Sequence, residues 1–190
     1  KTESGWDAYN TDVFGIQKAI SGLKIKTVSV LGTGATARSA IVAMQELDKQ
    51  ISLWGRSANP LKQLSAEFDV HQQLQLHKAC EADLVISTLP PRALDEHLSA
   101  IRTRPSGMLL DVAYDPWPSK AAELWGKEKT ISGIEMLIWQ AMFFLAPLLF
   151  LGFAQMAIAI NAWEAAGSEA SEKAEKKDEK RGLEGPRVLI

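Results

Sequence analysis

The chain has 190 residues, of which 46% are hydrophobic and 23% charged, a balance typical of one folded domain with or without a tail. This composition excludes collagen-like, disulfide-dense and wholly disordered proteins. The formal net charge of -2 does not favour a nucleic-acid binder. The single cysteine, Cys80, cannot form an internal disulfide, and we expect a cytoplasmic protein.

Residues 1–22 are predicted to form a linker and a connecting helix, which carries Val13, Ile16 and Ile20 on one face. From residue 23 to residue 132, strands alternate with helices. The predicted strands are 27–31, 51–54, 83–88, 107–112 and 130–131. This alternation predicts an α/β fold with a Rossmann-like parallel sheet and helices on both faces. Ligands of such folds bind at the carboxyl ends of the strands. The pattern of residues 70–82 favours no element.

The C-terminal part is less regular in pattern. Residues 133–166 are predicted to form C-terminal helices, and no charged residue occurs from Met136 to Trp163. That run is long enough to span a bilayer. We expect instead a helical hairpin, broken near Pro147 and Gly152 and buried against the sheet, with a membrane span as the alternative. Residues 167–190 are interpreted as a charged tail that is disordered.

A glycine-rich loop joins the first predicted strand to the helix after it. Residues 32–37 fit the pattern G-x-G-x-x-A. The first glycine permits a tight turn, the second lets the backbone approach a pyrophosphate, and the small third residue lets the helix pack on the strand. Backbone N–H groups at the helix start would face the phosphates. The alternative is a tight turn whose small residues serve packing alone. The predicted cofactor-binding residues here are Gly32, Thr33, Gly34, Ala35 and Thr36.

The second strand leads into Gly55-Arg56-Ser57. An NAD site usually has an acidic residue near this position to bind the ribose hydroxyls, and none is present. Arg56 can stack on adenine and pair with a 2′-phosphate, and Ser57 can add a hydrogen bond. These residues favour NADP over NAD as the cofactor. The alternative interpretation of Arg56 is an ordinary exposed arginine in a turn.

Six separated motifs together resemble one family. They are Asn10-Thr11-Asp12 with Gly15, the glycine loop through Arg38, Gly55–Ser57, Ala82–Thr88, Asp111–Pro116 and Gly133–Ala141. In this order and spacing they resemble shikimate dehydrogenase in its actinobacterial form, over about residues 5–141. The resemblance implies NADPH-dependent reduction of 3-dehydroshikimate to shikimate, on the route to chorismate and the aromatic amino acids.

Two other functions remain open from the sequence. One is a quinate/shikimate dehydrogenase that uses NAD. The other is a non-catalytic nucleotide-binding fragment, with or without attachment to a membrane. We expect a small-molecule substrate, no nucleic-acid partner and no membrane partner. The three histidines show no metal-ligand spacing, so no metal site is predicted.

The resemblance also implies roles for individual residues. Asp12 would lie beside the substrate hydroxyls and partner a catalytic lysine, and Tyr114 and Gln140 would contact the substrate. From the residues alone, Asp12 fits a helix-capping aspartate better. Gln140 stands in an apolar stretch, where its amide needs a hydrogen-bonding partner. The residues implied to line the cofactor are Thr88, Val112 and Gly133.

This sequence departs from the family pattern in three places. The family's catalytic lysine lies in a separate substrate domain, whose motifs are not among these 190 residues. We therefore expect the isolated chain to be inactive. Pro60 stands where the family has a second arginine. After Gln140 the family helix is amphipathic, whereas residues 143–153 are apolar throughout.

Overall fold

The computed structural model describes residues 10–183, with side chains up to residue 161. The chain divides into two compact units, Lys1–Phe143 and Phe144–Ile190. In chain order the described elements are α1 (Thr11–Ala19), β1 (Thr27–Leu31), α2 (Ala35–Glu46), β2 (Gln50–Trp54), α3 (Ala58–Phe68), β3 (His71–Gln72), α4 (Leu76–Ala79), β4 (Leu84–Ser87), the 3-10 helix η1 (Asp95–Ala100), β5 (Met108–Asp111), α5 (Lys120–Trp125), the 3-10 helix η2 (Lys127–Lys129), β6 (Thr130–Ser132) and α6 (Gly133–Leu183).

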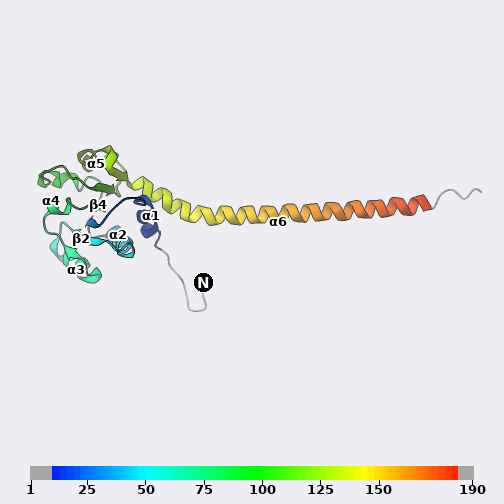
Figure 1. The fold of residues 1–190 in the computed structure, drawn as a ribbon, viewed down its shortest axis with the longest axis horizontal. Helices are drawn as coiled ribbons and strands as arrows, with labels where there is room; N and C mark the ends of the chain where they lie inside the picture. The colour runs from blue at the N-terminus through cyan, green and yellow to red at the C-terminus, as the bar shows by residue number, and fades with distance from the viewer. Residues whose placement is uncertain (1–9, 184–190) are drawn as a thin grey trace, which may run out of the picture. The chain divides into compact units, whose positions relative to one another are not determined.

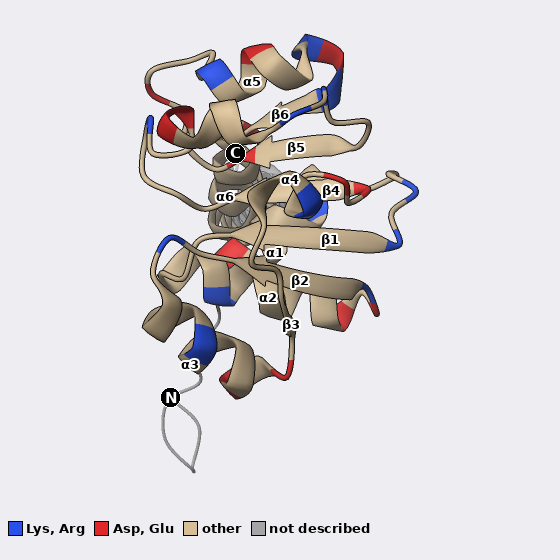
Figure 2. Ribbon diagram, turned by 90° about the vertical axis from the view of Figure 1, so that its left-hand side faces the viewer, with Lys and Arg blue, Asp and Glu red and all other residues tan. Residues whose placement is uncertain are grey.

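The strands of the described chain form one sheet in the order β3-β2-β1-β4-β5-β6, and every neighbouring pair is parallel. Figure 2 shows this order from β3, lowest in the view, to β6 near the top. The chain builds outward from β1 in one direction and then returns to add β4 on its other side. The gap between β1 and β4 is therefore the topological switch point of the sheet, where such folds bind ligands.

Helices cover both faces of the sheet, as predicted. Alternate side chains of a strand point to opposite faces, and two separate buried clusters result. Val28 and Val30 of β1 face a cluster that includes residues of α1, α2 and α3. Leu31 of β1 faces a second cluster, which includes Cys80 and the fully buried Trp125 of α5. The Rossmann-like α/β fold expected from the sequence is confirmed.

The five predicted strands all form, with bounds that differ from the prediction by at most one residue at either end. The sequence missed β3. Its two residues, His71 and Gln72, both have exposed side chains, so no apolar pattern marks them. They become a strand only because they pair with Ser52 and Leu53 of β2.

The predicted hairpin after residue 133 is wrong. α6 runs without interruption from Gly133 to Leu183 with Pro147 inside it (Figure 1). Leu148 to Leu151, between the two expected breaks, are all apolar and offer no polar turn to end a helix. Residues 167–183, expected to be a disordered tail, continue the same helix, and 184–190 lie outside the described residues.

One stretch of α6 has the length and composition of a membrane-crossing helix. Among the described residues, this is Gly133–Asn161, with a mean hydropathy of 2.2 over its most apolar 18-residue window. No residue of that window is buried. The burial against the sheet that we expected is therefore also wrong for that window, whereas Met136, near the start of α6, is buried in the core.

One carboxylate, that of Asp83, joins β4 to β1 at the edge of the sheet where the strands begin. Asp83, just before β4, accepts hydrogen bonds through Oδ2 from the backbone N–H groups of Lys26 and Thr27, both at 2.9 Å. Its own N–H donates to Thr27 Oγ1 at 3.0 Å. These backbone hydrogen bonds hold the pKa of Asp83 below its ordinary value of 3.8.

Asp83→Asn should remove a pH-dependent part of the stability. A lowered folded-state pKa contributes stability that is fully present above the unfolded value near 3.8 and is lost as the pH falls through the folded value. The stability difference between wild type and variant should therefore shrink as the pH drops below 3.8. Urea unfolding followed by tryptophan fluorescence over a pH series measures it.

Asp69→Asn is the matched control for this experiment. Asp69 is exposed and has a left-handed backbone conformation that asparagine also adopts readily. Its carboxylate accepts no hydrogen bond within the described chain. A difference between wild type and Asp83→Asn that stays constant with pH would contradict the role of Asp83.

Candidate functional site

The strands end in register at the carboxyl edge of the sheet. Leu31 of β1 pairs with Trp54 of β2 and with Ser87 of β4, Ser87 pairs with Asp111 of β5, and Asp111 pairs with Ser132 of β6. The residue that follows each of these five strands therefore lies along the same edge of the sheet. These following residues are Gly32, Gly55, Thr88, Val112 and Gly133. Four of the five are predicted cofactor residues, collected from segments far apart in the sequence.

Gly32 and Thr88 meet across the switch point between β1 and β4. Thr88 donates two hydrogen bonds to the Leu31 carbonyl, from its N–H at 2.8 Å and from its hydroxyl at 2.9 Å. This fixes the Thr88 side chain against the glycine loop, where a Cβ on Gly32 would collide with Thr88 Oγ1. Gly32 also has a φ of +123°, which side-chain-bearing residues rarely adopt. Both facts require glycine at this position.

The start of α2 is open to an anion. Gly34 is its N-cap residue, and no side chain caps the helix there. A Cβ built on Gly34 would meet nothing within 4 Å. The first N–H groups of a helix lack partners within the helix, and the positive end of the helix dipole favours a phosphate. Ala37 is fully buried under this turn, as the predicted packing position of the loop requires.

The turn after β2 lies against the same loop. A Cβ on Gly55 would approach Thr33 Cγ2 to 2.8 Å, so the two turns are in contact. Arg56 and Ser57 follow, and both are exposed. Within the described residues, Arg56 forms no ion pair, whereas Arg38 is bound to Glu67. The Arg56 guanidinium is thus available to a phosphate.

Ser57 is the N-cap residue of α3, but its hydroxyl makes no capping hydrogen bond. The hydroxyl is therefore available to a ligand oxygen, as the prediction for this residue requires. The helix itself begins at Ala58, so Pro60 is its third residue. A proline fits within the first helical turn, because the N–H groups there have no helical partner.

Val112 and Gly133, which follow β5 and β6, lie together at one end of the row of residues that follow the strands. A Cβ on Gly133 would collide with the Val112 carbonyl group. The Val112 N–H donates to the Ser87 carbonyl at 3.0 Å and extends the β4–β5 pairing by one residue. A cavity of ≈ 470 Å³ lies between the loops that follow β4 and β5, lined in part by Arg92, Ala113 and Pro116.

Asp12 and Gln140 are 128 positions apart in sequence and form a hydrogen bond. Gln140 Nε2 donates to Asp12 Oδ1 at 2.6 Å. The capping interpretation of Asp12 is wrong, because Asn10 caps α1 through a hydrogen bond from the Asp12 N–H to Asn10 Oδ1 at 3.0 Å. Asn10 Nδ2 also donates to Ser39 Oγ of α2 at 2.9 Å. The Asp12 carboxylate is therefore directed to Gln140 rather than to the helix end.

Gly15 makes this pairing possible. A Cβ at this position would lie 2.8 Å from the Met136 carbonyl oxygen and 2.9 Å from Gln140 Cγ. Such distances are too short for a real side chain, so α1 and the first turns of α6 pack more closely here than a Cβ at position 15 would allow. The motif that carries Asp12 thus also carries the glycine that brings Gln140 within reach.

Tyr114 is not joined to this pair. It lies in the loop after β5, is 49% exposed, and forms no hydrogen bond with Asp12 or Gln140. The structure therefore brings together two of the three predicted substrate residues.

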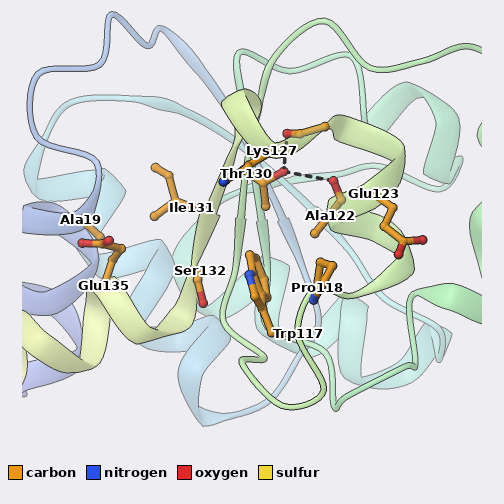
Figure 3. Close-up of a pocket in the computed structure, with 11 residues that line it drawn as sticks. Ala19, Trp117, Pro118, Ala122, Glu123, Lys127, Thr130, Ile131, Ser132 and Glu135 are labelled. Atoms are coloured by element: carbon orange, nitrogen blue, oxygen red, sulfur yellow. Dashed lines mark hydrogen bonds between the residues drawn. The ribbon is translucent and has the colours of Figure 1, made fainter.

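A second cavity lies beside β6 and contains none of the predicted site residues. Its volume is ≈ 780 Å³. Figure 3 shows Trp117 between Ser132 and Pro118, with Glu123 and Glu135 at opposite ends. Since ligands of this fold bind at the strand ends, we place the candidate site at the row of strand ends.

Sequence reasoning missed one buried pair of side chains near the strand ends, Asp111 and Ser119. Ser119 Oγ donates to Asp111 Oδ2 at 2.6 Å and accepts from the Ala122 N–H at 3.0 Å as the cap of α5. The pair closes the loop that carries Val112 and Tyr114. Burial raises the pKa of Asp111 above its ordinary value, although hydrogen bonds from Ser119, Ala113 and Ser87 oppose the rise. A carboxylate at the end of an otherwise apolar strand was the available signal.

Gly15→Val should destabilise the first unit by about 1–3 kcal/mol, because overpacking forces neighbouring atoms apart. The clash lies on the Met136 backbone and on the Gln140 side chain. The free energy of unfolding, measured in urea, should fall less for Gly15→Ala, which adds only the Cβ. A valine variant as stable as wild type would contradict the close approach of α1 and α6.

Asp111→Asn should change how stability varies with pH. A raised folded-state pKa contributes stability that is fully present below the unfolded value near 3.8 and is lost as the pH rises through the folded value. Asparagine keeps an oxygen that can accept from Ser119 and does not ionise. The variant should therefore gain stability relative to wild type as the pH rises above 3.8.

Urea unfolding over a pH series checks this, with Asp48→Asn, at an exposed position, as control. A stability difference between wild type and Asp111→Asn that is the same at every pH would show that the buried carboxylate carries no such penalty.

Comparison with known proteins agrees with this geometry. The family model described as NADP oxidoreductase, coenzyme F420-dependent, matches residues 27–114. The shikimate dehydrogenase (NADP(+)) of Ignicoccus hospitalis is 30% identical over 149 residues, which cover 71% of this chain and 55% of that protein. The chain spans about half the length of the curated relatives it matches.

Solved structures give the same result. The shikimate dehydrogenase of Mycobacterium tuberculosis has a TM-score of 0.62 and 32% identity, covering 74% of this chain and 56% of that one. The enzyme of Thermus thermophilus, solved in complex with NADP(H) and shikimate, has a TM-score of 0.61 and 26% identity over 72% of this chain and 55% of that one. The resemblance found in the sequence is confirmed: over about 70% of its length, this chain is homologous to the NADP-binding C-terminal part of shikimate dehydrogenases.

Proposed function

We propose that this chain is the cofactor-binding part of an NADP-dependent shikimate dehydrogenase, which reduces 3-dehydroshikimate to shikimate. The observation that carries the proposal is the in-register row of strand ends. It brings the glycine loop, Thr88, Val112 and Gly133 to one edge of the sheet. The reaction belongs to the route to chorismate and the aromatic amino acids, and we place it in the cytoplasm.

The cofactor would be held along this edge. The open start of α2 suits the pyrophosphate, because no side chain caps it and no acidic residue lies in its first turn. Arg56 and Ser57 suit a 2′-phosphate, since the guanidinium and the hydroxyl have no partners within the described chain. Val112 and Gly133 would line the nicotinamide, and Thr88, at the switch point, would lie where the chain passes the cofactor.

The substrate would bind beside the Asp12–Gln140 pair. A carboxylate accepts hydrogen bonds from sugar-like hydroxyls, and the amide of Gln140 can donate as well as accept. In the free protein these two side chains satisfy each other at 2.6 Å, so substrate hydroxyls would exchange with that bond. Tyr114, exposed in the loop after β5, is the third residue that the resemblance implies would contact the substrate.

When bound, NADPH supplies the hydride that reduces the ring carbonyl carbon. The carbonyl oxygen must then gain a proton to become the hydroxyl of shikimate. The resemblance assigns that proton to a lysine of the substrate domain, which Asp12 would orient and keep charged. The motifs of that domain are not among these residues, so we expect the 190-residue chain alone to bind the cofactor with little turnover.

Titration of the full chain with NADPH and NADH, followed by fluorescence, tests the proposal. We expect binding of both, with NADPH tighter. Arg56→Ala should weaken NADPH binding about tenfold or more, because a hydrogen bond to a charged group contributes about 1.5–3 kcal/mol. NADH binding should change little, since NADH has no 2′-phosphate. Arg102→Ala, at another exposed arginine, is the matched control.

Each other outcome has a distinct meaning. A folded chain that binds neither nucleotide would overturn the proposal. Unchanged NADPH affinity in Arg56→Ala would remove the role of Arg56. Tighter binding of NADH than of NADPH by the wild type would favour the NAD-using quinate/shikimate dehydrogenase.

A further inference from the structure

Residues 144–163 of α6, here named the apolar segment, contain no Asp, Glu, Lys or Arg. The described part of the segment, up to Asn161, exposes nearly all of its side chains. Phe150 is 74% exposed, Ile158 68% and Leu148 64%. Burying a side chain of this size contributes about 1.5–3 kcal/mol, so a surface of this extent marks a site of interaction.

The apolar surface surrounds the helix and does not form a stripe. Leu148, Leu149, Phe150 and Leu151 are consecutive and are each between 59% and 74% exposed. Successive residues of an α-helix point about 100° apart, so these four face all sides. A helix that is apolar all round is suited to a bilayer or to a protein core. A groove on a soluble partner would cover one side and leave the others in water.

The length also fits a membrane. Twenty residues at 1.5 Å each extend about 30 Å, the thickness of the hydrocarbon core of a bilayer. The segment ends at Trp163, and tryptophan is enriched where a helix meets the headgroups. Charged residues resume at Glu164 and continue through the run 168–181, which must stay in water. Pro147 lies inside α6 and lacks the N–H of one helical hydrogen bond, a loss that membrane-spanning helices tolerate.

Two common sources of a false membrane signal do not apply. The core helix of a soluble protein is mostly buried, whereas none of the most apolar window of this helix is buried. A signal sequence lies near the start of a chain, whereas this segment follows a folded unit.

We propose that the apolar segment crosses a lipid bilayer and anchors the nucleotide-binding unit to a membrane. This goes beyond the dehydrogenase function and does not depend on it. A second copy of the chain, packed helix against helix in water, is the competing occupant of the surface.

The test uses the full chain made by cell-free synthesis with vesicles of phosphatidylcholine and phosphatidylglycerol. After flotation and an alkaline carbonate wash, which releases peripheral proteins, the chain should remain with the vesicles. Phe153→Arg, near the middle of the segment, should reduce the ratio of vesicle-bound to free chain by about tenfold or more, because a charge at the bilayer centre is costly. Phe153 is 66% exposed, so the change creates no clash in the folded chain.

Leu74→Arg is the matched control. Leu74 is 75% exposed and lies in the first unit, between β3 and α4, so the same charge enters an exposed apolar position outside the segment. Its vesicle binding should equal that of wild type. Circular dichroism of both variants confirms that they are folded.

Three results would overturn the proposal. The chain could stay in the aqueous fraction as a dimer or larger oligomer by light scattering, which would assign the surface to a second copy. It could stay there as a monomer. It could also bind vesicles but be released by carbonate, which would place the segment on the membrane and not across it.

Discussion

The parallel register of the sheet places Leu31, Trp54, Ser87, Asp111 and Ser132 side by side at the carboxyl edge. Backbone hydrogen bonds between strands fix that register, and a shift by one residue would turn every side chain to the other face. The residues that follow the strands are therefore also aligned along this edge. The candidate site is therefore assembled from five segments of the chain that are far apart in sequence.

Small residues and one buried carboxyl group support this edge. Gly32 admits the Thr88 hydroxyl, and Gly133 admits the Val112 carbonyl, so neighbouring turns can touch. Beneath them, Ser119 holds the Asp111 carboxylate and closes the loop between the two residues. Burying that carboxylate costs free energy, and the burial raises its pKa. The hydrogen bond from Ser119 offsets part of this cost and holds the loop in one conformation.

The two units of the chain differ in how their apolar side chains are covered. In the first, alternate strand residues are covered by helices on both faces, and Cys80 is so well buried that its pKa rises to about 12, which makes the thiol unreactive at neutral pH. In the second, the apolar side chains described for residues 144–161 remain largely exposed. In a bilayer, lipid would cover the apolar side chains of this segment, as the sheet covers those of the helices packed on it.

Local sequence pattern was enough to predict five of the six described strands and the glycine loop, because these depend on neighbouring residues, and the order and spacing of six motifs indicated the family. Thr27–Leu31 is β-branched and of strand length, and Gly32 is required by its own backbone angle. Three other features became visible only in the folded chain: β3 exists, Asn10 caps α1, and Asp12 binds Gln140 across 128 positions. The continuity of α6 as one helix is a fourth. The Asn10 cap is a contact across only two positions, but Asn10 and Asp12 are both residue types that cap helices, so the pattern did not choose between them. The pairing of β3 and the Asp12–Gln140 hydrogen bond arise from contacts between distant segments, which local pattern does not contain.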